Sequence, residues 1–589
     1  MSERRKAIDV LLRRFGAHGV VAVSDDVPAG RGMVLKENVE PNNIIFHVPG
    51  SALLNVKTAA AFLHADLLPT SARPSARQGC DVESTGGTVP CFGTGQGLQG
   101  GSSSAGEKAE AELPLSSVQA LSLLLLLWRR RSRTSPSSLP PVPEPLADFA
   151  RTLPVDFDSV PLLWSLCQDQ QSRLCAALVE ALPAHSRQRL LDVRKRFAGD
   201  AHMVSAVLRL RPDLLPAWSS EIAYEELVGD DLLDDFYWAW LCVNSRCLYL
   251  PLGLKTREDN FTMAPVIDLI NHTFDKSIEC KVEYPAEGMQ IRAPKSDPKA
   301  FNVTKVRTEN GNTETEEQWQ RGCSKGDELF ITYGAHSNEF LLAEYGFVLP
   351  IATAPEPSAL LDLPNNPFAE VVVDDLMLEL LASAQSSLVQ AELKRELLRE
   401  RSYWLDWTIH PTGEPSHRLV CALRLLALDL NGSQQESGAT VAVLGHKASK
   451  RLRLQKQAPQ HQPQETKPPS SEAETSEAQL ARISEWESMV SGSTEFISQE
   501  NEEEARKILV KVCETVQDRT RKRRRALEDA FNMPTSYTSD GTGASKAGQV
   551  QLEVGRWIQS FRIVRSLLIE QEHIARIVLE ATKSTQEPW

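Results

Sequence analysis

The sequence predicts an α+β protein in which short strands and helices form the first 350 residues and helices form the rest. Short runs rich in β-branched and aromatic residues lie at 20–23, 44–49 and 329–333, a pattern typical of strands. Beyond residue 350 the apolar residues instead recur at helical spacing, in four long segments between 374 and 582. A chain of 589 residues is too long for one hydrophobic core, so two or three domains are expected.

The bulk composition excludes several classes of protein. Hydrophobic residues make up 41% and charged residues 24%, as in an ordinary globular protein. The formal charge of −14 argues against general binding of nucleic acid or of anionic membranes. The apolar run Leu121–Trp128 is much shorter than the ~20 residues that cross a bilayer, so a buried helix is predicted and no membrane contact is expected.

Cysteine spacing and the N-terminal sequence bear on metal binding and location. The ten cysteines include no C-x-x-C pair, so neither a zinc framework nor a redox pair is indicated, and no metal is expected. Residues 1–9 lack the apolar core of a secretory signal. A reducing compartment is therefore expected, the cytoplasm first and the nucleus second.

Composition also suggests domain boundaries. Strand-forming parts lie at 16–56 and 236–350, with helical segments between them at about 113–235. A helical domain is predicted at 351–589. Two polar segments cannot bury enough apolar surface to fold and are predicted to be disordered, at about 66–112 and about 431–482.

Two motif blocks flank a polar insert. The first, Ala264–Thr273, contains Asp-x-x-Asn-His, and the second, Gly326–Gly334, contains Asp-Glu-Leu-x-Ile-x-Tyr-Gly; a Tyr-Gly-Phe follows at 345–347. Each block alone has an ordinary structural interpretation. Asn271-His272 could satisfy backbone groups at the end of a strand, and the second block could be a turn that leads into a strand. The combination of the blocks points to a site.

Together the blocks resemble the two C-terminal signature motifs of SET-domain methyltransferases. They are similar to the subgroup that includes the plant Rubisco large-subunit lysine methyltransferase, fungal ribosomal-protein lysine methyltransferases and the animal actin-histidine methyltransferase. The resemblance implies a SET-type, β-rich pseudoknot core with a helical insertion, followed by an all-α substrate-binding domain. It therefore implies one first domain of residues 1–350, in which the helical segments at about 113–235 are an insert. In such a core the Tyr-containing segment threads past the Asn-His segment, between a cofactor face and a narrow substrate channel.

The resemblance implies S-adenosyl-L-methionine as the cofactor. Gly30-Arg31-Gly32 by itself is more often a hairpin turn than a cofactor loop. Arg246 by itself could be a surface residue after a core helix, but a guanidinium also suits the carboxylate of the cofactor. On the family interpretation the cofactor-binding residues are Ala29, Gly30, Arg31, Arg246, Asp268, Asn271 and His272.

Tyr333 is the predicted catalytic residue. Its hydroxyl could orient the nucleophile and accept weak C–H···O contacts from the methyl group in transfer. Tyr345 and Phe347 are predicted walls of the substrate channel, where aromatic rings attract a cation. Tyr284 is a further candidate wall, although the strand register cannot be fixed from the sequence.

The function predicted from these residues is S-adenosylmethionine-dependent methylation of a lysine in a non-histone protein, such as a ribosomal protein. Histidine methylation is the alternative within the same scaffold. A catalytically silent SET-fold scaffold that binds a protein partner is the alternative of another class. The basic run Arg519–Arg525 could contact RNA or direct nuclear import, but a solvated helix face is favoured. A monomer is expected.

Overall fold

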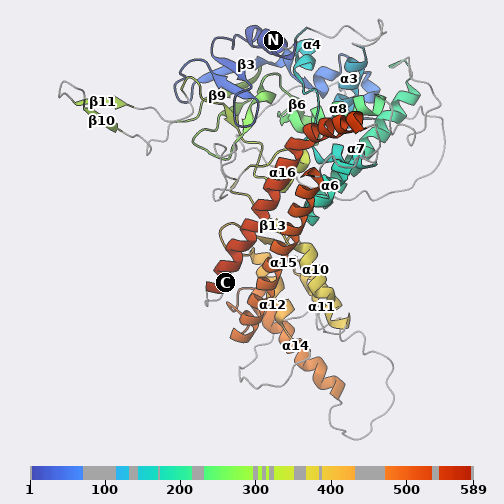
Figure 1. Cartoon of the computed structure of the whole chain (residues 1–589), viewed down its shortest axis with the longest axis vertical. Coiled ribbons are helices and arrows are strands. Elements are labelled where there is room, and N and C mark those ends of the chain that lie inside the picture. The colour runs from blue at the N-terminus through green and yellow to red at the C-terminus, as the bar shows by residue number, and fades with distance from the viewer. Residues whose placement is uncertain are drawn as a thin grey trace. The chain divides into compact units, whose positions relative to one another are not determined.

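The computed structural model describes residues 3–69, 114–131, 144–169, 173–211, 213–214, 231–295, 303–307, 313–317, 324–349, 366–383, 388–430, 471–532, 543–584 and 589. The chain forms two compact units (Figure 1). The first comprises Met1–Glu180, Ser186–Phe368 and Met533–Val564, and the second comprises Ala181–His185, Ala369–Asn532 and Arg565–Trp589.

The observed division differs from the predicted domains in two respects, one of which is that Ala181–His185 belongs to the second unit. The first unit ends its main segment at Phe368, close to the predicted boundary at residue 350, but it also includes 533–564. The reason is visible in a set of polar contacts within this unit. The Arg556 guanidinium binds both carboxylate oxygens of Asp158, at 3.0 and 2.8 Å, and the Ser560 hydroxyl donates to the Asp158 carbonyl at 2.7 Å.

The strands of the first unit are short and form several small sheets. They are β1 (Val21–Ser24), β2 (Gly32–Leu35), β3 (Ile44–Pro49), β4 (Leu54–Asn55), β5 (Cys247–Tyr249), β6 (Phe261–Met263), β7 (Asn271–His272), β8 (Lys281–Glu283), β9 (Gly288–Arg292), β10 (Val303–Arg307), β11 (Thr313–Glu317) and β12 (Phe330–Ile331). β1 pairs with β2, and two three-stranded sheets have the orders β3-β9-β8 and β4-β6-β5. β10 and β11 pair with each other in the polar insert between the two motif blocks.

The segment 326–331 bonds to two parts of this unit that are far apart in the sequence, β2 and β7. Its first part pairs with β2, where the Leu329 amide donates to the Met33 carbonyl at 2.7 Å. Its second part is β12, which pairs in parallel with β7 so that Ile331 lies opposite His272. The late segment therefore lies between the N-terminal hairpin and the Asn-His segment and bonds to both. This is the arrangement expected of the pseudoknot.

Most labelled helices of the first unit lie to one side of β3 and β9 in Figure 1. They are α1 (Glu3–Arg14), α2 (Val56–Ala59), α3 (Ser117–Arg131), α4 (Glu144–Thr152), α5 (Pro161–Asp169), α6 (Arg173–Ala181), α7 (Ala184–Leu210), α8 (Asp231–Arg246) and α9 (Asn338–Tyr345). The leucine run of α3 is buried and α3 packs against α8, which confirms the predicted core helix. In the part of the chain that the structure describes, we find no helix long and apolar enough to span a bilayer.

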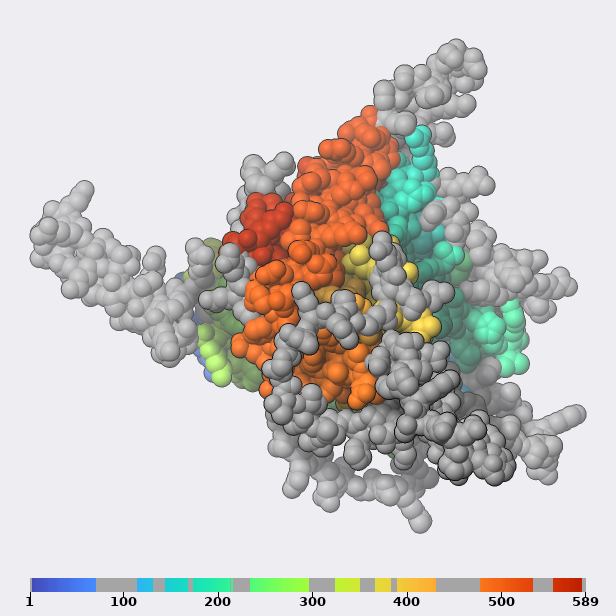
Figure 2. All heavy atoms as spheres, turned by 90° about the horizontal axis from the view of Figure 1, so that it is seen from below, coloured from blue at the N-terminus to red at the C-terminus, as the bar shows by residue number. Residues whose placement is uncertain are grey.

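Among its described residues, the second unit is helical apart from one short antiparallel pair of strands. That pair is β13 (Val371–Val372) with β14 (Thr408–Ile409). The helices are α10 (Asp374–Ser383), α11 (Leu388–Glu400), α12 (His417–Ala427), α14 (Ser471–Val490), α15 (Gln499–Asn532) and the C-terminal part of α16 (Gly543–Ser584). The orange helices α14 and α15 form much of the face shown in Figure 2.

Two predicted disordered segments fall largely outside the described residues. The segment at about 66–112 overlaps the described chain only up to residue 69, where a short 3-10 helix spans Ala65–Leu67. The predicted disordered segment at about 431–482 ends too late, because helix α14 already begins at Ser471. Ala and Glu in 471–482 are good helix formers, and a composition rich in polar residues does not distinguish an exposed helix from disorder.

The basic run Arg519–Arg525 lies in α15, and several of its guanidinium groups pair with acidic side chains of the second unit. Arg519 binds Glu379 at 2.6 Å, and Arg521 binds Glu572 at 2.6 Å. Because acidic side chains neutralise these guanidinium groups, the predicted solvated helix face is favoured over an RNA-binding patch.

A buried ion pair in the second unit gives a stability prediction. Arg424 binds Glu502 through two nitrogens, at 2.8 and 3.0 Å, and both side chains are buried. Arg424→Lys keeps the charge but cannot make the same forked contact, so we expect the free energy of unfolding to fall by about 1–3 kcal/mol. The reverse exchange Lys507→Arg, at the exposed pair with Glu504, should change it by less than about 0.5 kcal/mol. Thermal unfolding of both variants tests this, and equal midpoints would contradict it.

Candidate active site

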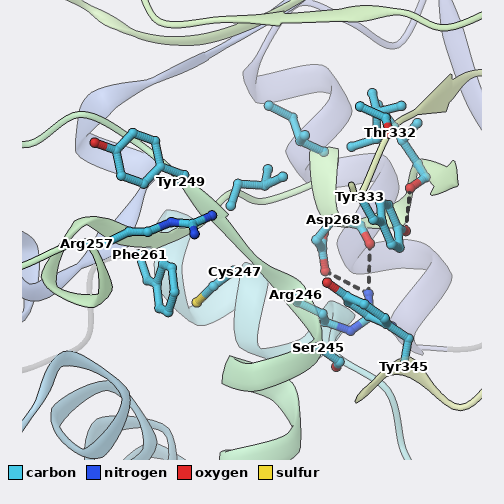
Figure 3. A pocket seen from close by; sticks show the side chains of 14 residues that line it. Ser245, Arg246, Cys247, Tyr249, Arg257, Phe261, Asp268, Thr332, Tyr333 and Tyr345 are labelled. Carbon is cyan, nitrogen blue, oxygen red and sulfur yellow. Dashed lines mark hydrogen bonds and ion pairs between the residues drawn. The ribbon is translucent and has the colours of Figure 1, made fainter. Parts of the chain in front are cut away.

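A cavity lies where α8 passes into β5, beside the Asn-His segment and β12 (Figure 3). Four aliphatic side chains contribute to its wall: Leu248, Ile267, Ile270 and Ile331. Tyr333 and Tyr345 line it near Arg246 and Asp268, and Tyr249, Arg257 and Phe261 line it at the opposite end (Figure 3). The cavity is thus largely apolar, with one buried pair of opposite charges at one end.

Arg246 and Asp268 form that pair. Arg246 is the last residue of α8, and its Nη1 donates to the Asp268 carbonyl at 2.9 Å and to Asp268 Oδ2 at 3.0 Å. The Asp268 side chain has no exposed surface. Burial raises the pKa of this carboxyl group, and Arg246 opposes the shift. Arg246 Nε and Asp268 Oδ1 are both buried and have no hydrogen-bond partner, so the pair has unused donor and acceptor capacity.

The backbone before Asp268 is strained. Val266 has a φ of 73°, which a β-branched residue rarely adopts. Such a conformation costs about 1–3 kcal/mol and persists where the surrounding structure enforces it, often at functional sites. Val266 is buried and precedes the 3-10 turn Ile267–Leu269, which places Asp268 against Arg246.

Tyr333 lies just beyond the end of β12 and is held through several of its polar atoms. Its amide donates to His272 Nδ1 at 3.1 Å, and its hydroxyl donates to the Ile270 carbonyl at 2.8 Å. The His272 ring stacks on the Tyr333 ring, with centroids 5.1 Å apart. Burial raises the pKa of Tyr333 to about 12, so the phenol stays protonated at neutral pH. This residue can position a reacting group but is not a general base at that pH.

Asn271 connects the two motif blocks to the N-terminal hairpin. Its Nδ2 donates to the Arg31 carbonyl and to Glu328 Oε1, each at 2.7 Å. Burial raises the pKa of Glu328, and the hydrogen bond from Asn271 opposes the shift. The Arg31 guanidinium points elsewhere and binds Asp25 at 2.6 Å. The main chain of the hairpin, rather than the Arg31 side chain, therefore meets Asn271.

Gly32 is needed for this contact. A Cβ at this position would lie 2.2 Å from Glu328 Oε1 and 2.8 Å from Asn271 Nδ2. We expect Gly32→Ala to displace both side chains and to destabilise the protein by about 1–3 kcal/mol. Gly19→Ala is the matched control, since nothing lies within 4 Å of its Cβ. Thermal unfolding compares the two, and an unchanged midpoint for Gly32→Ala would show that the contact is dispensable.

The structure brings most of the predicted site residues into one neighbourhood. Arg246, Asp268, Tyr333 and Tyr345 line the cavity. His272 contacts Tyr333, and the Phe347 ring lies 6.3 Å from that of Tyr333, although neither His272 nor Phe347 lines the cavity.

The remaining predicted residues lie beside the cavity or beyond its lining. Tyr284 is half-buried, and partial burial, together with the nearby Tyr249, raises its pKa to about 12. Ala29 and Gly30 lie in the turn between β1 and β2, and Gly30 has a φ of 86°. That turn reaches the site through the Arg31 carbonyl.

Arg4 lies near the site, and no feature of the sequence predicts this. Arg4 in α1 donates from Nε to the Thr152 carbonyl at 2.6 Å. Burial, with the charges of Arg31 and Arg246, lowers the pKa of Arg4 to about 10, so Arg4 lies near these guanidinium groups. An arginine in an amphipathic helix has no local feature that identifies such a role. Among the described residues, no group of three or more His, Cys, Asp or Glu side chains could hold a metal ion.

Comparison with known proteins bears on the family. No family model matches the chain. Ribosomal lysine N-methyltransferase 2 of Saccharomyces cerevisiae is 26% identical over 441 residues, which cover 71% of this chain and 81% of that protein. SET domain-containing protein 4 of Homo sapiens is 28% identical over 257 residues, 43% of this chain and 46% of that protein. The chain is thus similar in sequence to SET-domain proteins.

Further matches cover less of the sequence or are more remote. Ribosomal lysine N-methyltransferase set11 of Schizosaccharomyces pombe is 28% identical over 191 residues, 32% of this chain and 36% of that protein. The solved structure of Rubisco LSMT bound to sinefungin and monomethyllysine has a TM-score of 0.48 at 14% identity, covering 99% of this chain and 92% of that one. A structural likeness at this level is a distant one. The SET-type α+β architecture is thus identified from the motif geometry and the sequence relatives.

Proposed function

We propose that this SET-domain protein is an S-adenosylmethionine-dependent protein-lysine N-methyltransferase. The observation that supports the proposal most is the placement of Tyr333 beside the buried Arg246–Asp268 pair in an apolar cavity. Its yeast relatives at 26% and 28% identity carry the name ribosomal lysine N-methyltransferase, which supports a ribosomal protein as the substrate.

The residues at the charged end of the cavity fit the amino-acid group of S-adenosylmethionine. That group carries one amine cation and one carboxylate. Asp268 Oδ1 is a buried acceptor without a partner and suits the amine, while Arg246 Nε is a buried donor without a partner and suits the carboxylate. Arg4 adds positive charge on the same side. When bound, the cofactor supplies a methyl group on a sulfonium.

The residues of the hairpin and of β7 would hold the rest of the cofactor. We propose contacts with the main chain at Ala29, Gly30 and Arg31, and with Asn271 and the main chain of His272. Glu328 would act indirectly, because its carboxylate holds the Asn271 amide at 2.7 Å.

The apolar part of the cavity favours a neutral amine nucleophile. A free lysine has a pKa of about 10.4, so it must lose a proton before it can attack. An aliphatic and aromatic environment disfavours the ammonium form and lowers that pKa. Tyr333 already donates its hydroxyl hydrogen to the Ile270 carbonyl, so its oxygen lone pairs face other groups. Tyr345, Phe347 and Tyr284 are proposed as aromatic walls that guide the side chain.

The titration of His272 and His336 is expected to have no effect on the pH dependence of kcat. Burial lowers the pKa values of His272 and His336 to about 4, from an ordinary value of 6.5. Both stay neutral above about pH 5, so kcat between pH 6 and 9 should rise only as the substrate lysine loses its proton. Measurement of kcat across this range tests the expectation. An inflection between pH 6 and 7 that His336→Asn abolishes would contradict it.

Transfer of radiolabelled methyl groups from S-adenosylmethionine to purified ribosomes tests the proposed function. We expect label in one or a few ribosomal proteins, with methyl-lysine found by mass spectrometry. Methyl-histidine would replace the proposal by its histidine-directed alternative. Cofactor binding without transfer to ribosomes, actin or a whole-cell extract would favour the catalytically silent scaffold.

The proposal also includes the cellular location and the oligomeric state of the protein. We propose a monomer that acts in the cytoplasm, with the nucleus as a second location, because ribosomal proteins are made in one compartment and assembled partly in the other. Analytical ultracentrifugation and imaging of a tagged chain test these points. A stable dimer or a secreted product would contradict them.

A further inference from the structure

Asp158 lies where the C-terminal helix α16 contacts the helical insert of the first unit. The Arg556 guanidinium forms a forked ion pair with its carboxylate, in which Nε and Nη2 lie 3.0 and 2.8 Å from the two oxygens. The Asp158 carbonyl accepts two further hydrogen bonds, from the Ser560 hydroxyl and from the Trp164 indole, each at 2.7 Å. Ser560 and Trp164 are buried. Three residues thus hold Asp158 through both its side chain and its main chain.

The two residues that follow Asp158 pack against Gly346. A Cβ on Gly346 would lie 2.7 Å from Ser159 Oγ, 2.9 Å from Val160 Cγ2 and 3.1 Å from the Ser159 carbonyl carbon. Gly346 also has a φ of 78°, in the left-handed region that favours glycine, where it ends α9. The main chain at Gly346 is therefore in contact with Ser159 and Val160, and the contact leaves no room for a side chain.

Gly346 lies between two proposed walls of the substrate channel. Tyr345 lines the cavity, and its ring centroid lies 5.2 Å from that of Tyr333. The Phe347 ring lies 6.1 Å from the Tyr345 ring and 6.3 Å from the Tyr333 ring. A shift of the main chain at Gly346 would therefore move both aromatic walls relative to the proposed catalytic residue.

We propose that Asp158 and Arg556 are positioning residues: their ion pair fixes the segment 158–160, and this segment holds the Tyr345–Phe347 wall of the substrate channel in place beside Tyr333. The proposal rests on the proposed methyltransferase function. It gives the first half of α16 a role in the site of the first unit, to which residues 533–564 belong. Because neither Asp158 nor Arg556 lines the cavity, loss of the pair should change the use of the protein substrate and leave cofactor affinity unchanged.

Reversal of one charge tests the ion pair. Arg556→Glu places a carboxylate against that of Asp158, and the repulsion should displace the segment 158–160. We expect kcat/KM for the ribosomal substrate to fall about 10-fold or more, because a small misplacement of reacting groups lowers a rate steeply. The Kd for S-adenosylmethionine should change less than about twofold. Arg556→Lys keeps an attractive charge and should retain at least about half of the parental kcat/KM.

A matched control separates this effect from a general loss of stability. The Arg556 and Asp158 side chains are 51% and 25% exposed, and ion pairs this exposed contribute little to stability, so the variants should remain folded. Arg211 makes the same forked contact with Asp213 in the first unit, at 3.0 and 2.9 Å. Arg211→Glu should change neither kcat/KM nor the Kd. If the Kd for S-adenosylmethionine of Arg556→Glu rose in parallel with the loss of kcat/KM, the site would be disturbed as a whole and the proposal would be overturned.

A second substitution should rescue the first. Asp158→Asn combined with Arg556→Glu removes the repulsion, because the amide can donate to the introduced carboxylate. We expect this double variant to recover most of the parental kcat/KM, which is the non-additivity that two residues in contact show. A double variant as impaired as Arg556→Glu alone would show that the effect does not pass through Asp158 and would overturn the proposal. Parental kcat/KM in Arg556→Glu itself would do the same.

Nuclear magnetic resonance gives a test that does not require activity. With ¹³C-labelled tyrosine rings, Arg556→Glu should shift the Tyr345 resonance, assigned by Tyr345→Phe, and leave that of Tyr403 in the second unit unchanged. An unmoved Tyr345 resonance would also overturn the proposal. Absence of methyl transfer by the parent chain would reject the proposed function, while these spectra would still decide whether the ion pair positions the channel wall.

Discussion

Replacement of Tyr333 by phenylalanine is expected to lower kcat for methyl transfer about 100- to 1,000-fold, the range seen when one preorganised polar contact to the transition state is removed. The hydroxyl donates to the Ile270 carbonyl at 2.8 Å, so its lone pairs are directed away from that bond. Its pKa of about 12 keeps it protonated, so the loss reflects positioning and polar stabilisation rather than loss of a base. Initial rates with saturating S-adenosylmethionine measure the effect.

Cofactor affinity provides the control for Tyr333→Phe. The ring and its stacking on His272 remain, so the Kd for S-adenosylmethionine should change less than about threefold. Tyr403→Phe, in the second unit, should change neither quantity. A Tyr333→Phe variant with at least half of the parental kcat would contradict the assignment of Tyr333 as the catalytic residue.

Replacement of Asp268 by alanine is expected to raise the Kd for S-adenosylmethionine at least about 100-fold. Asp268 is fully buried against Arg246, and its free Oδ1 is the proposed acceptor for the amine of the cofactor. The change removes that acceptor and leaves the Arg246 charge buried without its partner, which typically costs about 3–5 kcal/mol. Isothermal titration of the cofactor measures the affinity.

Folding must be separated from binding in the Asp268 series. Asp268→Asn keeps the side-chain shape and is the companion variant for cases in which Asp268→Ala unfolds. Asp213→Asn is the matched control, because Asp213 pairs with Arg211 at an exposed position. Parental affinity in a folded Asp268→Asn variant would show that the carboxylate does not bind the cofactor.

Local sequence patterns predicted the elements that carry the site. The leucine run marked the buried helix α3, and the runs rich in β-branched and aromatic residues marked β1, β3 and β12. The Asn-His block and the Tyr block were expected to meet, and β7 and β12 do pair. The helices and strands could be predicted because each depends on residues that are near one another in the chain. The pairing of the two blocks could be predicted because the family resemblance implies it.

Contacts between distant parts of the chain could not be predicted in the same way. The bond from Asn271 to the Arg31 carbonyl joins residues 240 positions apart, and its second acceptor, Glu328, looked like an ordinary turn residue. The ion pair between Arg246 and Asp268 was not predicted either, because the motifs place each residue at the cofactor separately. Strand register decides which aromatic residues line a cavity, and with two- and three-residue strands the sequence does not specify it. Tyr249 lines the cavity, whereas Tyr284, the predicted wall, is not part of its lining.

Isothermal titration of S-adenosylmethionine into the full chain, with methyl transfer to purified ribosomes measured on the same preparation, tests the central claim most directly. The account predicts one cofactor per chain, competition by S-adenosylhomocysteine, and methyl-lysine in a ribosomal protein that Tyr333→Phe nearly abolishes. A well-folded chain that binds no S-adenosylmethionine would contradict the account.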